Sequence, residues 1–432
     1  MSEIALAITP TGTRYKVLAL LVLLAGITYL DRLCISAAAP TIAREFNLSP
    51  SQMGWIFSAF TFAYAIFEIP SGYLGDRWGT RSALVRIVLW WSAFTMLTAA
   101  TMGFTSLFIV RLLFGAGEAG AVPNSAGTVS RWFPASQRGR AMAAVCIGHA
   151  IGASATVPLV QELMQHQHWR WPFVEFGLIG VLWCAVWFWW FRDLPEDHPS
   201  VNHAELALIR AERSQGFQSS HKLDVPWSVL LRSRNLWLIC AMYFAYGYSL
   251  YFYINWLPTY LIQARGFSRQ YVGLFSALPW LFGAAAFVCG GWATDYIVER
   301  TGSRKLARRS LGLTGLAMSA LMLLIVARTN DRMLAAWLIA FALFFQFLTT
   351  PSCWAVCIDT GRRIAGIISG TMNMTGNLAG AIGGVVIGYI VDKFGSWPLA
   401  FYLAAGSLLC GALIWLLIDP EKPLIAESKI TQ

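Results

Sequence analysis

The stretch from Val17 to Ala39, VLALLVLLAGITYLDRLCISAAA, decides the fold of this chain. It is apolar almost throughout, and its only charged residues are Asp31 and Arg32. The hydrocarbon core of a bilayer is ~30 Å thick, and a helix rising ~1.5 Å per residue needs about 20 apolar residues to cross it. The run ends on three alanines that resemble a signal-peptide cleavage site, but it continues past Arg32 and more apolar runs follow, so we expect an uncleaved membrane helix.

Eleven more apolar runs of similar length follow along the chain. The 432 residues are 57% hydrophobic and 12% charged, against about 25% charged in an ordinary soluble domain, which excludes a water-soluble enzyme. The sequence therefore predicts an all-α membrane protein with twelve transmembrane helices. The predicted spans are 17–39, 52–73, 83–102, 106–129, 141–164, 173–191, 236–262, 272–293, 311–327, 333–357, 364–391 and 399–418.

The basic residues predict the orientation of the chain. Cytoplasmic loops of membrane proteins carry an excess of lysine and arginine, and 23 such residues fall on one side of the predicted spans against 7 on the other. The more basic side holds both ends of the chain, so we expect both termini in the cytoplasm. The net charge of +10 then reports topology, and no nucleic-acid partner is expected.

One long polar stretch, from Arg192 to Arg234, divides the spans into two sets of six. Within it, Asn202 to Ser214 has helical propensity and mixed charge, which predicts a cytoplasmic surface helix. The predicted organisation comprises an N-terminal six-helix half (1–192), a cytoplasmic linker (193–235), a C-terminal six-helix half (236–419) and a cytoplasmic tail (420–432).

An internal repeat supports this division. The run GYLGDRWGTR (72–81) follows the second span, and GWATD (291–295) follows the eighth, which is the second span of the second half. Two six-helix halves with a substrate site between them near the membrane midplane are the plan of a parallel-repeat transporter. The alternative is a set of twelve helices without functional symmetry.

No cofactor or metal site is expected from the sequence. All eight cysteines fall in apolar spans, and Cys353 with Cys357 has no second pair or histidine cluster nearby. The run GAGEAG (115–120) satisfies the pattern of a dinucleotide-binding turn, but no strand precedes it. No pairing of a nucleophile with a base emerges either, so we do not expect an enzyme.

Four charged residues of the predicted spans stand out, because an ionisable side chain there costs ~2.5–3.5 kcal/mol. Asp31 and Arg32 belong to the first span, and Arg111 and Glu118 to the fourth. Depths counted from the span ends make Arg111 the expected partner of Asp31, with Glu118 deeper toward the cytoplasm. A fixed clamp between two helices is one interpretation, but apolar packing could replace such a pair at little cost, which favours a functional role.

These four residues combine two kinds of chemistry. A buried carboxylate can take up or release a proton as its surroundings change. An arginine offers a permanently charged planar fork that suits a carboxylate ligand. Proton-handling acids beside anion-binding arginines describe a symporter that couples an organic anion to protons.

Several motifs extend along both halves of the chain. They are YLDR (29–32), AAP (38–40), the stretch 58–64 leading to GYLGDR (72–77), RLLFGAGEA (111–119), RWFP (131–134), WLPTYL (256–261) and GNLAG (376–380). Together they resemble the anion:cation symporter family of the major facilitator superfamily, whose bacterial branch includes galactonate, glucarate and hexuronate transporters. The resemblance implies the major facilitator fold and a multi-pass protein of the bacterial inner membrane, which we expect to be a monomer.

The resemblance also implies roles for individual residues of the first half. Asp31 and Glu118 match the two proton-handling acids of the sugar-acid symporters, and Arg111 matches the arginine linked to them. Arg32 and Tyr64 match residues that contact the substrate.

The resemblance relates four further positions to substrate contact or substrate choice. Asn377 falls where the second half of the family supplies a polar substrate contact, and Trp354 is expected to do the same, with interhelical bonding and packing as the alternatives. His149 lies near a substrate-contacting glutamine of the galactonate transporter, although a lone intramembrane histidine is more often a helix contact. Glu68 stands where relatives usually carry glutamine, so the resemblance leaves the exact solute open.

The repeated acidic and basic motif has a different expected role. At the cytoplasmic ends of spans two and three, Asp76, Arg77 and Arg81 can meet a helix terminus and neighbouring charges when the halves close on that side. Asp295 and Arg304 are the corresponding residues of the second half. We expect these residues to form a gate.

The expected function is import of a small carboxylated solute, most simply a sugar acid, together with protons by alternating access. The closest rival is a carrier of aromatic or dicarboxylic acids, phthalate- or tartrate-like, because the stretch 244–256 is rich in aromatic residues. A cation exporter is disfavoured because paired arginines repel cations, and a membrane sensor because no signalling domain is appended.

Overall fold

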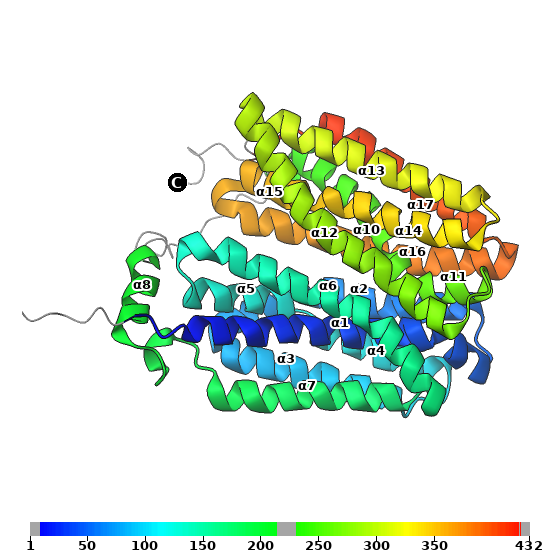
Figure 1. Cartoon of the computed structure of the whole chain (residues 1–432), viewed down its shortest axis with the longest axis horizontal. Helices are drawn as coiled ribbons and strands as arrows, with labels where there is room; N and C mark the ends of the chain where they lie inside the picture. The colour runs from blue at the N-terminus through cyan, green and yellow to red at the C-terminus, as the bar shows by residue number, and fades with distance from the viewer. Residues whose placement is uncertain (1–8, 214–229, 423, 425–432) are drawn as a thin grey trace, which may run out of the picture.

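The computed structural model of the chain describes residues 9–213, 230–422 and 424. Regular structure in these residues is helical, and long helices run side by side through the molecule (Figure 1). The helices are α1 (Thr13–Glu45), α2 (Pro50–Trp78), α3 (Thr80–Thr98), α4 (Phe104–Glu118), α5 (Ala121–Trp132), α6 (Ala135–His166), α7 (Trp171–Trp190), η1 (Pro195–Asp197), α8 (His203–Arg213), α10 (Arg234–Asn255), α11 (Leu257–Gln263), α12 (Arg269–Thr301), α13 (Arg304–Arg328), α14 (Arg332–Leu348), α15 (Thr350–Gly361), η2 (Arg362–Ile364), α16 (Ala365–Phe394) and α17 (Trp397–Leu417).

The helices confirm the prediction of an all-α membrane protein. Among the described residues, ten helical segments are long and apolar enough to cross a bilayer, with α4 and α5 counted as one segment and α14 and α15 as another. Helices α2 and α3 lie in the same bundle, packed against α4 and α7 respectively. Most helices also extend beyond the predicted apolar runs, because polar end turns continue the backbone hydrogen bonding where the hydrophobic pattern has stopped.

Three predicted spans are wrong as single helices, because each is broken. The fourth span, 106–129, divides into α4 and α5 at Gly120, whose φ of +97° is costly for any residue with a Cβ. A Cβ there would also lie 2.5 Å from the Ser71 Cβ. The seventh span breaks at Trp256 before Pro258, and the tenth at Thr349 before Pro351. The third helix lies slightly earlier in the chain than expected, at Thr80–Thr98.

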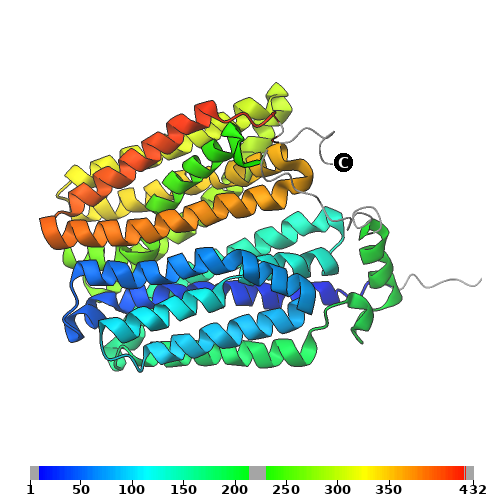
Figure 2. The ribbon, with the colours of Figure 1, turned by 180° about the vertical axis from the view of Figure 1, so that it is seen from behind.

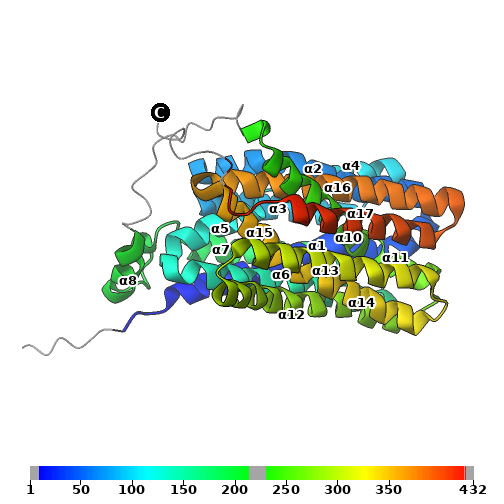
Figure 3. The same cartoon turned by 90° about the horizontal axis from the view of Figure 1, so that it is seen from above.

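The long helices form two bundles, α1 to α7 in one and α10 to α17 in the other (Figures 1 and 2). Two pairs of helices make the main contacts between the bundles, α2 with α16 and α6 with α12. Each pair joins the second long helix of one bundle to the fifth of the other, so the interface has approximate two-fold symmetry. Helix α8 lies beyond the end of the first bundle (Figure 3) and confirms the predicted surface helix.

Helices α2 and α16 touch closely along one part of their length, which we call the α2–α16 seam. An added Cβ at Gly54 would lie 2.5 Å from the Gly384 carbonyl oxygen, and the Ser58 hydroxyl donates to the Ala381 carbonyl at 2.5 Å. On the same face of α16 but nearer its start, an added Cβ at Gly366 would meet nothing within 4 Å. The halves therefore touch at the end opposite the chain termini and separate toward the end that carries them.

Candidate functional site

A buried ion pair joins α1 to α4 inside the first bundle. The Arg32 Nε donates to the Glu118 Oε1 at 3.0 Å, and the Arg32 Nη2 contacts the same oxygen. Arg32 is 8% exposed and Glu118 is fully buried. Glu118 is the last residue of α4, so the break at Gly120 places its carboxylate at a helix end. In an apolar bundle, loss of either partner would leave the other as an uncompensated buried charge, which is strongly destabilising.

The predicted pairing of Asp31 with Arg111 is present only as an electrostatic interaction between the two side chains. No ion pair of the described residues joins them, and both Asp31 carboxylate oxygens and the Arg111 Nε lack a hydrogen-bond partner. Consecutive helical residues point about 100° apart, so Arg32 faces Glu118 while Asp31 faces α3 beside Trp91. Asp31 and Arg111 nevertheless both interact electrostatically with Glu118, so the four predicted charges form one group.

Aromatic rings surround the guanidinium of Arg32. Its Cζ lies 4.9 Å from the ring centroid of Tyr64 and 5.2 Å from that of Tyr29. The Tyr29 ring in turn lies 5.2 Å from the His149 ring and 5.7 Å from Trp280, which belongs to α12 of the second bundle. The structure thus brings the predicted residues Tyr64 and His149 to Arg32, and adds Tyr29 and Trp280, which the sequence reasoning missed.

The second bundle contributes a polar cluster on α16. The Asn377 Oδ1 accepts a hydrogen bond from the Tyr251 hydroxyl at 2.8 Å, and the Asn377 Nδ2 donates to Glu68 at 3.4 Å. The Asn373 Nδ2 donates to the other Glu68 oxygen at 2.8 Å. Arg32 interacts electrostatically with both Tyr251 and Glu68, so this cluster faces the first-bundle charges. The sequence reasoning missed Tyr251 and Asn373. It did single out Glu68, which binds Asn373, as a position where relatives usually carry glutamine.

Trp354, the other substrate contact expected from the second half, lies against Tyr243 of α10. Its ring packs edge-on against Tyr243 with a centroid distance of 6.5 Å, and the side chain is 38% exposed. Tyr243 stacks on Tyr246 at 5.1 Å. Trp354 therefore extends an aromatic wall along the second bundle.

The predicted gate residues of the first half lie at the end of the bundle that carries the termini. The Arg81 backbone N–H donates to Asp193 at 2.9 Å, and its Nε donates to the Phe188 carbonyl at 3.1 Å. Arg77 is exposed, and the side chain of Asp76 lies outside the described part of the chain. Asp193 was not predicted, since it lies far from the motif in sequence.

The second-half copy of this motif contacts an acid that the sequence did not single out. Asp295 is exposed, and Arg304 pairs instead with Asp359 at 3.6 Å. Arg308 also pairs with Asp359, at 3.2 Å. The acid that engages the basic residues of α13 is thus Asp359, which comes from α15.

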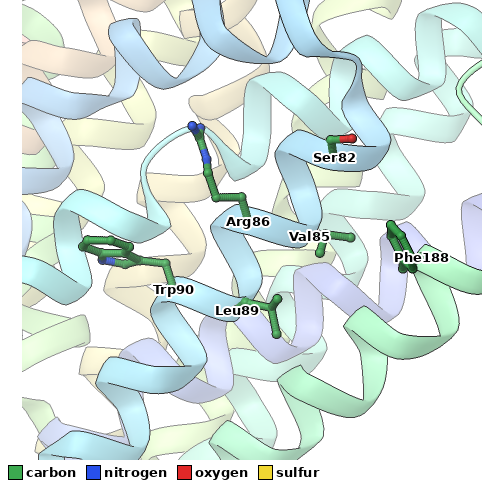
Figure 4. Close-up of a pocket in the computed structure, with 6 residues that line it drawn as sticks. All are labelled: Ser82, Val85, Arg86, Leu89, Trp90 and Phe188. Atoms are coloured by element: carbon green, nitrogen blue, oxygen red, sulfur yellow. The ribbon is translucent and has the colours of Figure 1, made fainter.

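A separate groove lies on the outer surface between α3 and α7 (Figure 4). Arg86 is the only charged residue of its lining, and most of the rest is apolar, so it lacks the paired acids and arginines that characterise the group around Arg32. The groove is lined by Ser82, Val85, Arg86, Leu89, Trp90 and Phe188. We therefore place the candidate site between the bundles.

Two helical bundles, with a group of buried charges on one side of their interface and polar side chains on the other, are typical of a multi-pass membrane transport protein. The chain belongs to the Major Facilitator Superfamily, whose model matches residues 21–384. It is 34% identical over 408 residues to the probable sulfoacetate transporter SauU of Cupriavidus necator, covering 94% of each chain. It is 32% identical over 417 residues to the hexuronate transporter of Bacillus subtilis, covering 96% of each chain.

Other similarities agree with this assignment. The probable galactarate/D-glucarate transporter GudP of Bacillus subtilis is 32% identical over 448 residues, with 98% of this chain and 96% of that one covered. A solved structure of a bacterial homolog of the human lysosomal transporter Spinster, in an inward-facing and unoccupied conformation, matches with a TM-score of 0.71. That match covers 94% of this chain and 95% of the other at 17% identity, and it supports the fold alone.

Proposed function

We propose that the protein is a proton-coupled symporter that imports a small organic anion, most simply a sugar acid, by alternating access. The observation that carries this proposal is the buried pair of Arg32 and Glu118, because its guanidinium also interacts electrostatically with Tyr251, the hydrogen-bond partner of Asn377 in the second bundle. The names of the relatives, which include hexuronate and galactarate/D-glucarate transporters, support a carboxylated solute.

The Arg32 guanidinium is the proposed binding group for the substrate carboxylate. It already holds the Glu118 carboxylate through two nitrogens, and a substrate carboxylate would compete for the same donors. Protonation of Glu118 removes its charge and releases Arg32 to the substrate. Anion binding therefore favours proton uptake by Glu118, and each event is unfavourable without the other. Symport requires this coupling.

We propose that Asp31 and Arg111 also take part in coupling proton movement to solute movement. The Asp31 oxygens have no hydrogen-bond partner among the described residues, and an unpaired buried carboxylate is costly in its charged form. A proton on Asp31 removes that cost. Arg111, packed 4.8 Å from the Phe60 ring that also contacts Arg32, keeps a positive charge near both acids as protons come and go.

The seam between the halves suggests how access alternates. The halves touch at the end opposite the termini and separate at the other, so under the predicted topology, with both termini cytoplasmic, this state opens to the cytoplasm. The other state requires the contacts to move to the opposite end. Arg81, Arg77, Asp76 and Asp295 lie there, and we propose that they form a latch in that state.

The same topology gives the proposed organisation of the protein. It would lie in the bacterial inner membrane as a monomer, with an N-terminal half (1–192) and a C-terminal half (236–419) that rock about the site. The linker (193–235) and the tail (420–432) would face the cytoplasm with both termini.

Uptake into proteoliposomes tests this function. The purified protein is reconstituted, and entry of radiolabelled D-galactonate, D-glucuronate or D-glucarate is measured with and without an inward proton gradient. The proposal expects the gradient to drive accumulation, and expects Asp31→Asn and Glu118→Gln to abolish it. Accumulation that ignores the gradient, or that survives unchanged in both variants, would contradict proton coupling.

A second candidate solute class is favoured by the aromatic wall of Tyr243, Tyr246 and Trp354. Flat rings can pack an aromatic acid, and the probable sulfoacetate transporter among the relatives indicates that doubly charged anions also fit this scaffold. A thermal-shift screen of hydroxylated, aromatic and sulfonated acids separates these classes, because only a ligand that binds the folded carrier raises its melting temperature.

A further inference from the structure

Glu68 forms a polar link between the two halves beside the region where their described residues separate. On one face of α16, the residues at 388, 384 and 381 touch α2 closely, while Gly370 and Gly366 have no neighbour within 4 Å of an added Cβ. The amides of Asn373 and Asn377 lie between these two regions on the same face. Glu68 binds both of them from α2, so it marks the inner edge of the seam.

This contact occupies an amide that a substrate would need. The Asn377 Oδ1 is engaged by Tyr251, and its Nδ2 is engaged by Glu68. The other Glu68 oxygen is engaged by Asn373 at 2.8 Å. The inference rests on the function proposed above, in which an anion lies between Arg32 and α16. The Glu68 carboxylate takes one of the two Asn377 N–H donors, so an anion that binds this amide must lie beside a like charge or displace it.

Glu68 also competes for the positive charge of the site. Among the described residues, the charged or titratable groups that interact with it are Arg32 of α1, Tyr64 of its own helix and Tyr251 of α10, and α16 offers it only neutral amides. Arg32 is already paired with Glu118. One guanidinium would therefore serve two carboxylates, and an incoming anion would be the third.

We propose that Glu68 is a specificity-determining residue that admits an anion only together with one proton of its own. As a carboxylate it keeps the α16 amides occupied and repels the solute. When it takes a proton from the aqueous side, the new O–H can donate to a substrate oxygen while the remaining carbonyl oxygen still accepts from Asn373. The proton leaves Glu68 again when the substrate is released, so one proton moves for each solute beyond those carried by Asp31 and Glu118.

The test compares Glu68→Gln, which keeps the size and loses the charge, with Glu68→Asp, which keeps the charge on a shorter side chain. Binding of D-galactonate and D-glucarate to the purified full-length carrier is measured at pH 6 and pH 8, and the proton-to-solute ratio is taken from reversal potentials in proteoliposomes. We expect E68Q to bind about tenfold more tightly at pH 8 because one repulsive charge is gone. Its pH dependence should flatten and its ratio fall by one proton, while E68D keeps the wild-type pH dependence.

Asn373→Ala provides a second route to the same answer, should E68Q not fold. It removes one donor from the Glu68 carboxylate without changing any charge, so the proton is held more firmly and binding should persist to higher pH. Unchanged pH dependence and ratio in E68Q, or an unchanged pH profile in N373A, would overturn the Glu68 proposal while leaving symport intact. Absence of binding and uptake of every acid by the wild-type carrier would instead overturn the proposed function itself.

Discussion

Arg32 and Glu118 come from helices α1 and α4 and meet inside the first bundle, where the guanidinium donates from two nitrogens to a single carboxylate oxygen. The other Glu118 oxygen has no partner among the described residues. The pair is thus incompletely satisfied in a place where a purely structural pair would be expected to have all its polar atoms engaged. The free oxygen of Glu118 is consistent with an ion pair that separates when Arg32 binds a ligand and Glu118 takes up a proton.

Replacing Glu118 by glutamine should separate binding from coupling. The new amide can still accept a hydrogen bond from Arg32 but cannot titrate, so the variant should still bind the anion, and only the pH dependence contributed by Asp31 and Glu68 should remain. Gradient-driven accumulation should fall by about tenfold or more, because the proton no longer contributes to the driving force. Counterflow exchange, which needs no gradient, should persist, and Glu118→Asp should retain partial coupling. Loss of exchange together with accumulation would indicate a structural role instead.

Replacing Arg32 by lysine should weaken binding even though the charge is kept. A lysine ammonium is a compact point charge that cannot donate in a planar fork or stack on Tyr64 as the guanidinium does. We expect the apparent affinity for D-galactonate to fall by about tenfold, measured by thermal shift against ligand concentration. Arg210→Lys on the surface helix α8 is the matched control. Equal affinities in the two variants would remove Arg32 from the substrate site.

Replacing Gly54 by alanine should disfavour the observed state of the seam. The added Cβ would lie 2.5 Å from the Gly384 carbonyl oxygen, and such overpacking typically costs about 1–3 kcal/mol. Gly366→Ala is the matched control, because its Cβ would meet nothing within 4 Å. Labelling of cysteines introduced at each end of the seam should show G54A shifted toward the opposite opening. The same labelling pattern in G54A and G366A would contradict the close contact.

Glu205 should contribute stability that depends on pH. Burial alone would raise the pKa of this carboxyl, but it accepts hydrogen bonds from Thr11 and from the backbone N–H groups of Thr13 and Arg14 at the start of α1, which lower the pKa overall. A pKa lower in the folded than in the unfolded state adds stability above the ordinary glutamate value of about 4.3. That stability is lost as the pH falls through the folded-state pKa.

Melting temperatures of Glu205→Gln and of the wild type at pH 7 and near pH 4 check this expectation. The variant should lose about 1–3 kcal/mol of stability at pH 7, and the difference from the wild type should shrink in acid. Glu162→Gln, at an exposed acid of α6, is the control and should melt as the wild type does. A constant difference at both pH values would show that the contact contributes through packing alone.

The sequence predicted the fold more completely than the site. Apolar run length is enough to find long helices, and polarity with helix propensity was enough to find α8. The breaks after Glu118 and at Trp256 and Thr349 were missed because the apolar pattern continues through them, while the backbone turns on a single glycine or proline. Hydrophobicity does not record such local backbone changes.

The site shows a similar division between composition and geometry. Charged residues are rare inside the spans, and this rarity identified the residues that lie together in the structure. Their depth in the membrane, however, does not show whether Asp31 or Arg32 faces a given residue of α4. Asp31 and Arg32 differ by one residue and point in different directions, and the direct ion pair forms between Arg32 and Glu118. The contact of Glu68 with Asn373 joins residues 305 positions apart, and a single sequence contains no signal for such a pairing.

The central claim is that solute and protons cross together through the Arg32 and Glu118 pair. Its most direct test is proton movement driven by the solute alone, measured with a pH-sensitive dye trapped inside proteoliposomes that start with equal pH on both sides. Adding D-galactonate, D-glucuronate or D-glucarate outside should acidify the interior for whichever acid the carrier transports, and Glu118→Gln should lower the acidification per solute because one proton-carrying acid is gone. Entry of the labelled solute with no change in internal pH would contradict the account.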